Sequence, residues 1–499
     1  MELTFQKTVC PCLRKVIGQV QVQEQTQEVR LPDSMPDIGR VLDSWGQVLL
    51  RSKEWRGNGM VVSGGVMTWV LYATEAEPQP QSVEVWIPFQ MRWEFPQTQR
   101  DGTICVLPQL KSVDARSTSA RKLMVRANIS LLGEAMEPIE AELCVPEDNV
   151  KDIQLLTVTY PLDIPKEAGE KQVLIDEELV LPGVMPPVDK ILRYALMPKV
   201  LEQKVMAGRL VFRGKCGLHM LYASQAGSVH TWDTEIPFSQ YAELDRDYGS
   251  GSSSGILPVI TNLELVLDEQ QHLLLKCGIA AQYQISDRVM AQVVEDAYSP
   301  HRQVKIQMDT LQLPVRLDQQ EHVLQLNGVL DAEPERIVDV TGFADHPQLR
   351  QEGDMIQLVV PMQMQVLHYD PSGNLQSAAL RCEQSVAMAS DPHNSVDTYV
   401  QMDNWPQATI IGNNVQLAAQ CQMTANVYAD QGISMVSGIS AGEPTEPDPA
   451  RPSVVLRRKG NARLWDIAKE LGSTVEHIKQ ANALEEEPAD DKMLLIPVL

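Results

Sequence analysis

The strongest constraint on the fold of this chain is an internal repeat with an offset of 150 residues. The matched segments are Leu31-Pro32 with Leu181-Pro182, Met35-Pro36 with Met185-Pro186, Gly64 with Gly214, Leu71-Tyr72-Ala73 with Leu221-Tyr222-Ala223, and Leu107-Pro108 with Leu257-Pro258. Ile87-Pro88-Phe89 recurs as Ile236-Pro237-Phe238, one residue short of this offset. Because the order and spacing are otherwise kept, the repeat indicates a duplicated folding unit.

Apolar and polar residues alternate near the end of each unit, which is typical of a half-buried strand. The apolar positions are Leu123, Val125, Ala127 and Ile129 in the first unit and Leu273, Leu275, Cys277 and Ile279 in the second. A third and more divergent copy shows the same alternation at Val415, Leu417, Ala419 and Cys421.

The remaining apolar runs are short and are separated by Pro, Gly, Asn and Asp, which favours antiparallel β-structure. We therefore expect a mainly β fold with three repeated β-rich domains, sandwich- or barrel-like, at residues 1–165, 166–305 and 306–440. A short helix is expected after Met35-Pro36 and again after Met185-Pro186, because apolar residues follow there at helical spacing.

Charge limits the partners of the protein. The 499 residues include 42 Lys and Arg against 66 Asp and Glu, a net charge of −24, so phosphate backbones and anionic membranes attract the chain poorly. The first residues lack the pattern of a secretory signal, and no apolar stretch is long enough to span a bilayer. We expect a cytoplasmic protein that binds no nucleic acid and does not cross a membrane.

Few residues suggest chemistry. The eight cysteines are scattered, which predicts reduced and buried thiols, although Cys10-Pro-Cys12 could bind a metal or sense redox state. Sequences of the HExxH and Walker types are absent, and the carboxylates form no distinctive cluster. The expectation is a non-enzymatic protein without a cofactor or a metal.

The C-terminal segment has a different composition. Residues 441–453 contain four prolines and three acidic residues and no large apolar group, which predicts a semi-extended linker. Residues 454–499 then predict strand, helix, helix and strand. Apolar residues at helical spacing end at Gly472, and Ser473-Thr474-Val475-Glu476 has the form of a capping box that opens the second helix.

This last segment resembles a LysM domain. The resemblance is carried by Lys459-Gly460, by Leu464-Trp465-Asp466-Ile467-Ala468, by the run from Gly472 to Asn482, and by the terminal Leu-Leu-Ile-Pro. The family usually has Gly-Asp-Thr before Leu-Trp, whereas this chain has Gly460-Asn461-Ala462-Arg463. Because that loop helps to form the glycan-binding groove of the family, the departure argues against carbohydrate binding but not against the fold.

The repeated region, with its Leu-Pro-x-x-Met-Pro, Leu-Tyr-Ala and Ile-Pro-Phe elements, resembles the domain that precedes LysM in clostridial spore-coat morphogenetic proteins of the SipL type. The resemblance implies a scaffold of the mother-cell cytoplasm, located at the forespore surface and in the spore coat. Its implied partners are the ATPase that forms the basement layer of the coat (SpoIVA-like) and other coat proteins. In that family the LysM domain takes part in the protein contact.

The residues expected to bind the partner are Arg463, Trp465, Asp466, Lys469 and Asn482. Trp465 lies one residue off the apolar stripe of its helix, so it is either an exposed interaction anchor or a part of the small core. Two alternatives stay open. The module could bind peptidoglycan, or the repeats could contain an unrecognised catalytic domain of a cell-wall hydrolase. The hydrolase alternative is the weaker one, because the repeated units share no set of polar residues that could form an active site.

Overall fold

The computed structural model describes the chain except for residues 1, 5, 75–78, 97, 99, 146–151, 250, 312, 314, 353–354, 389–393, 430–431 and 445–450. The described residues form 25 strands and two helices, which confirms the mainly β prediction. The sheets are open three- and four-stranded layers together with one two-stranded ribbon, and none of the described sheets closes into a barrel.

The first part of the body consists of two packed three-stranded sheets, β2-β7-β6 and β3-β4-β5, which we call the first sheet pair. Their apolar residues face one another in a shared core. The strands are β2 (Gln6–Arg30), β3 (Arg40–Trp55), β4 (Gly59–Ala73), β5 (Gln81–Glu94), β6 (Thr103–Ser119) and β7 (Lys122–Val145).

The second sheet pair, β8-β13-β12 with β9-β10-β11, repeats this order. Its strands are β8 (Gln154–Val180), β9 (Val188–Met206), β10 (Arg209–Ser224), β11 (Val229–Glu243), β12 (Ser253–Leu267) and β13 (His272–Tyr298). The registers carry the same offset as the sequence: Arg30 lies opposite Lys122, and Val180 lies opposite His272.

The third sheet pair has shorter and more numerous strands. Its sheets are β15-β22-β20, with β21 beside β22, and β16-β18-β17, with β19 beside β18. The strands are β15 (Val315–Asp331), β16 (Arg336–Ala344), β17 (Gln348–Glu352), β18 (Met355–Tyr369), β19 (Leu375–Met388), β20 (Ser395–Met402), β21 (Gln407–Ile411) and β22 (Asn414–Ala429).

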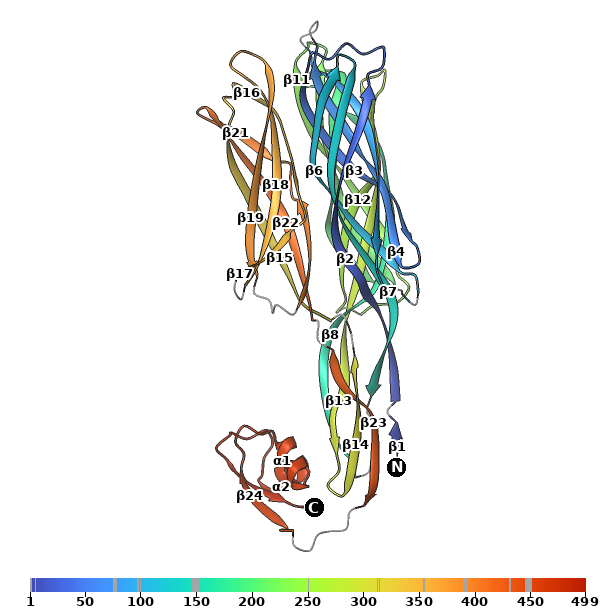
Figure 1. Cartoon of the computed structure of the whole chain (residues 1–499), viewed down its shortest axis with the longest axis vertical. Helices are drawn as coiled ribbons and strands as arrows, with labels where there is room; N and C mark the ends of the chain where they lie inside the picture. The colour runs from blue at the N-terminus through green and yellow to red at the C-terminus, as the bar shows by residue number, and fades with distance from the viewer. Residues whose placement is uncertain are drawn as a thin grey trace.

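Four long strands continue below the sheet pairs into a narrower part, which we call the arm (Figure 1). The arm contains residues 6–15 of β2, 136–145 of β7, 154–165 of β8 and 286–298 of β13, together with a third sheet. That sheet has the order β1-β23-β14, where β1 is Glu2–Thr4, β14 is Arg302–Leu311 and β23 is Ile433–Pro444. Register shifts at Val16 and Lys166, again 150 residues apart, mark where the strands leave the sheet pairs.

The helices predicted after Met35-Pro36 and Met185-Pro186 are wrong. Both segments are turns, closed by bonds from the amide of Met35 to the carbonyl of Pro32 (3.0 Å) and from Met185 to Pro182 (2.8 Å). The next residues enter β3 and β9, where a bulge shifts the alternation by one residue. A bulge close to a strand start therefore produced apolar spacing that resembles a helix.

The Leu-Tyr-Ala motif stabilises these turns. The hydroxyl of Tyr72 donates to the carbonyl of Pro36, and that of Tyr222 donates to Pro186, both at 3.1 Å. Both tyrosine side chains are buried, so each hydroxyl needs such a partner. The motif thus anchors the turn that carries the Met-Pro dipeptide.

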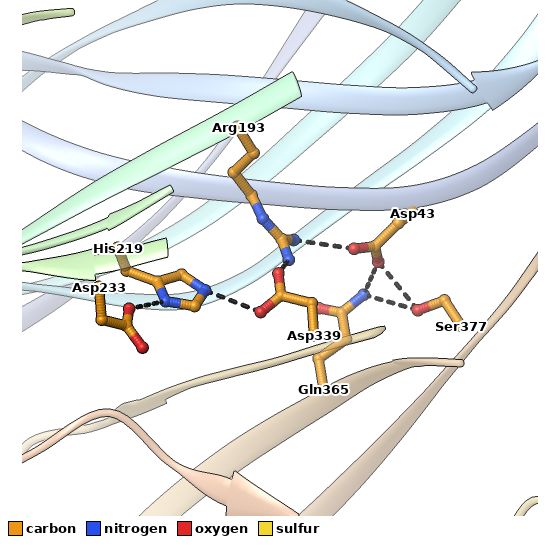
Figure 2. Close-up of polar contacts among 7 residues, drawn as sticks. All are labelled: Asp43, Arg193, His219, Asp233, Asp339, Gln365 and Ser377. Carbon is orange, nitrogen blue, oxygen red and sulfur yellow. Dashed lines mark hydrogen bonds and ion pairs between the residues drawn. The ribbon is translucent and has the colours of Figure 1, made fainter. Parts of the chain in front are cut away.

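A cluster of buried charges joins the three sheet pairs (Figure 2). Asp43, Arg193 and Asp339 come from β3, β9 and β16, one from each pair. They occupy matching positions, because each follows a bulge and lies opposite a leucine, namely Leu71, Leu221 and Leu367. These three leucines share one core cluster. Equivalent positions of the three sheet pairs therefore lie together at one point in the body.

The guanidinium of Arg193 lies between two carboxylates, donating to Asp43 at 2.8 Å and also to Asp339. His219 of β10 contacts Asp339 through Nε2 at 2.7 Å and Asp233 through Nδ1. Burial alone would lower the pKa of His219, but the two carboxylates outweigh it and raise the pKa to about 9. The imidazole is therefore charged at neutral pH and donates from both nitrogens.

Removing the central cation should destabilise the fold strongly. In Arg193→Met the carboxylates of Asp43 and Asp339 stay buried without their counter-ion, so we expect a loss of about 3–5 kcal/mol in urea unfolding. The matched control is Arg213→Met, because the side chain of Arg213 is 69% exposed and pairs with Glu202; it should cost less than about 1 kcal/mol. Equal losses would contradict a structural role for the cluster.

The cluster also predicts a pH dependence. The pKa of His219 is raised in the folded state, so its stabilisation is complete below about pH 6.5 and is lost as the pH rises through about 9. The loss should amount to roughly 3 kcal/mol in urea titrations between pH 6.5 and pH 9.5. A His219→Gln variant should lack this slope, and retention of the slope would assign it to another group.

Candidate functional site on the C-terminal module

Residues 454–499, here called the module, form β24 (Val454–Arg458), α1 (Leu464–Leu471), α2 (Val475–Ala481) and β25 (Met493–Pro497). The strands pair antiparallel, with Leu456 opposite Leu495. Of the predicted linker, residues 441–444 belong to β23 and residues 445–450 lie outside the described part. Neither described helix is long and apolar enough to cross a membrane.

The ends of both helices follow from local chemistry. Gly472 ends α1 with φ of 61°, a left-handed conformation that glycine adopts without strain. Thr474 caps α2, accepting a bond from the amide of His477 at 3.1 Å. Arg463 offers no such cap for α1, and the carboxylate of Glu487 instead accepts from the amide of Leu464 at 2.8 Å.

Two of the predicted binding residues, Trp465 and Lys469, meet a carboxylate of the arm. The indole nitrogen of Trp465 donates to Asp296 of β13 at 2.8 Å, and the ammonium of Lys469 donates to both oxygens of Asp296 at 2.7 Å. Burial alone would raise the pKa of Asp296, but the bonds from Lys469 and Trp465 lower it. Asp296 therefore remains a carboxylate that carries a charge-assisted contact.

Tyr298 completes this contact. Its ring lies edge-on to that of Trp465, with centroids 4.7 Å apart, and its hydroxyl donates to the carbonyl of Ser473 at 3.0 Å. Trp465 is only 7% exposed, so it belongs to the core between module and arm. Of the two interpretations that the sequence left open for Trp465, the structure favours the buried one.

The other three predicted residues lie apart from this contact. Arg463 and Asp466 form an exposed ion pair at 3.2 Å, and the bond from Arg463 lowers the pKa of the Asp466 carboxyl. Asn482 bonds the backbone of Leu495 in both directions, which ties the end of α2 to β25. The five residues thus divide into an arm contact, an exposed pair and a structural amide.

Asp296 and Tyr298 were missed by sequence reasoning. They lie 169 and 167 residues before Trp465, and no motif links the end of β13 to the module. The equivalent positions of the first unit, 146 and 148, fall outside the described residues. Only the three-dimensional path of β13 into the arm brings them to α1.

The Cys10-Pro-Cys12 segment lies in the arm, where the ammonium of Lys166 donates to the sulfur of Cys10 at 3.0 Å. Both thiols are buried in the arm core, and burial raises the pKa of Cys12 to about 11, which favours an inert thiol. The seven cysteines for which the structure describes the side chain are all free, and six of them are buried. No group of metal-ligating side chains occurs in the described part of the chain.

Comparison with known proteins gives one match. Residues 187–265, which include β9, β10 and β11 and most of β12, match the family model described as "SipL, SPOCS domain". This is a non-catalytic, sporulation-associated domain family, so the match indicates a sporulation-related protein. No curated protein and no solved structure matches the chain.

The module should depend on its few buried side chains. Ile467 is fully buried, so Ile467→Ala should destabilise the module by about 2–5 kcal/mol and accelerate amide exchange in α1 and α2 of the full chain. Gln480→Ala, at an exposed position of α2, is the control and should change stability by less than about 0.5 kcal/mol. Unchanged exchange in Ile467→Ala would show that the arm alone holds the helices in place.

Proposed function

We propose that this protein is a non-enzymatic assembly adaptor of the spore coat. Its C-terminal module, taken as a LysM domain, binds the basement-layer ATPase (SpoIVA-like) and promotes encasement of the forespore. The protein acts in the mother-cell cytoplasm at the forespore surface and joins other coat proteins through its three β-rich domains. The observation that carries this proposal is the match of residues 187–265 to the SipL SPOCS family.

The surface of the module supports a protein contact. Arg463 and Asp466 form an ion pair whose side chains are 59% and 47% exposed, and Lys469 is 43% exposed beside them. Cations and an anion along one helix suit a polar protein surface. Lys459, directly before the loop that leads into this helix, forms an ion pair with Asp490 at 3.0 Å.

The body supports the scaffold part of the proposal. Three sheet pairs joined by buried charges form a stiff unit, and the arm extends from it to the module (Figure 1). Long, partly exposed edge strands such as β8 and β14 offer sites for strand addition by other coat proteins. A stiff body with a small binding module at its end suits an adaptor.

Truncation tests the assignment of partner binding to the module. The shortened chain should end at Pro444 and keep β23, because β23 pairs with β14 and completes the arm. We expect purified basement-layer ATPase to be captured by the full chain and lost on truncation at Pro444. Equal capture by both forms would move the interface to the sheet pairs or the arm.

Sedimentation with purified peptidoglycan is the companion measurement. A protein-binding module should leave the full chain in the supernatant. Recovery of the full chain in the pellet, with the shortened chain in the supernatant, would favour glycan binding by the module and contradict the adaptor proposal.

A further inference from the structure

The contact between module and arm resembles a bound ligand. An extended segment at the end of β13 presents an acid, Asp296, and an aromatic ring, Tyr298, to one side of α1. In the module, the indole N–H of Trp465 and the ammonium of Lys469 both donate to the carboxylate. The ring of Trp465 packs edge-on against the tyrosine ring. Both partners are therefore chemically matched at two adjacent points.

The backbone of β13 is shaped for this presentation. A register shift between Val294 and Asp296 sets Glu295 outside the ladder with β8, so the strand bulges immediately before the contact. Residues two apart on a strand point to the same side, which places Asp296 and Tyr298 together beyond the bulge. Bulges of this kind re-aim side chains at the end of a sheet.

Charge favours the same pairing. The end of β13 is acidic, and Lys469 of α1 contacts it, while Arg463, the residue before α1, lies near enough to feel its charge and is paired with Asp466. Glu295 is already paired to the hydroxyl of Tyr160, so Asp296 is the carboxylate available to the module. The surface of α1 therefore selects an acidic segment.

We propose that the α1 surface formed by Arg463, Trp465 and Lys469 is a binding site for an extended segment with an acid two residues before an aromatic residue. Asp296 and Tyr298 of the same chain occupy this surface in the structure. An external partner that carries the same pair of residue types competes with them for it. The identity of the external partner rests on the proposed function. The chemistry of the segment that the surface binds does not depend on it.

Competition lowers the apparent affinity of the external partner. The surface binds it only in the fraction of molecules whose module has left the arm, so the apparent dissociation constant rises by the inverse of that fraction. A change that releases the arm contact and leaves α1 intact should tighten binding. A change on α1 itself should release the module and yet weaken binding.

The test uses the peptide Gln292–Ser299 as the probe and the full chain as the receptor. Binding is followed by ligand-observed NMR of the tyrosine ring, up to about 1 mM peptide, the range of typical effective concentrations for tethered sites. We expect the peptide to bind Asp296→Asn about fivefold more tightly than the unchanged chain, and to lose binding in Asp296→Asn combined with Lys469→Glu.

The controls separate the surface from the fold. Asp176→Asn removes an acid near Lys276, 20 residues along β13 from Asp296, and should behave like the unchanged chain. A peptide with Asn in place of its Asp296 should not bind. Lys469→Ala, which keeps a good helix former, replaces Lys469→Glu if amide exchange shows that α1 is lost. Equal binding to the unchanged chain and Asp296→Asn, or no binding to either, would overturn the proposal.

The ATPase gives a separate readout. We expect capture of the basement-layer ATPase to strengthen in Asp296→Asn and to fall in Lys469→Glu. Peptide binding as expected, with no ATPase capture by any form, would reject the proposed function and retain the binding surface. ATPase capture that is unchanged in both variants would retain the proposed function and show that its partner does not use this surface.

Discussion

Arg193, held between Asp43 and Asp339, is the contact on which the arrangement of the body depends. Each of the three residues comes from the matching position of a different sheet pair, so the cluster brings together equivalent surfaces that carry different charges. Two buried carboxylates without the guanidinium would repel each other and lack solvation. The charge pattern therefore specifies which sheet pair faces which.

This specification has a consequence for the arm. The strands β2, β7, β8 and β13 run from the sheet pairs into the arm without interruption, so the orientation of the body fixes the position of the arm. The end of β13 carries Asp296 and Tyr298 to the module in turn. The strand β13 thus links the second sheet pair, whose β9 carries Arg193, to the contact at the module.

The sequence contained the periodic information and lacked the long-range contacts. Period-two alternation predicted the mainly β fold, because it reports which face of each strand is buried. The reversal from Asp43 to Arg193 is visible at the offset of 150, but its meaning needs Asp339, which lies in the third sheet pair and outside the clear repeat. The helices predicted beyond Met35-Pro36 and Met185-Pro186 failed because a bulge imitated helical spacing. The contact of Trp465 with Asp296 has no local signal at all.

The strength of the module contact suits a displaceable occupant. The pair of Lys469 and Asp296 is partly exposed, with side chains 43% and 21% accessible, so screening keeps its contribution within about 1 kcal/mol. Burial of Trp465 against Tyr298 adds an aromatic contact of roughly 1 kcal/mol beyond its area term. An interaction of this size holds a tethered module at high effective concentration. It also yields to a partner whose concentration exceeds its dissociation constant for the free module by roughly 100-fold, which is worth about 2.7 kcal/mol.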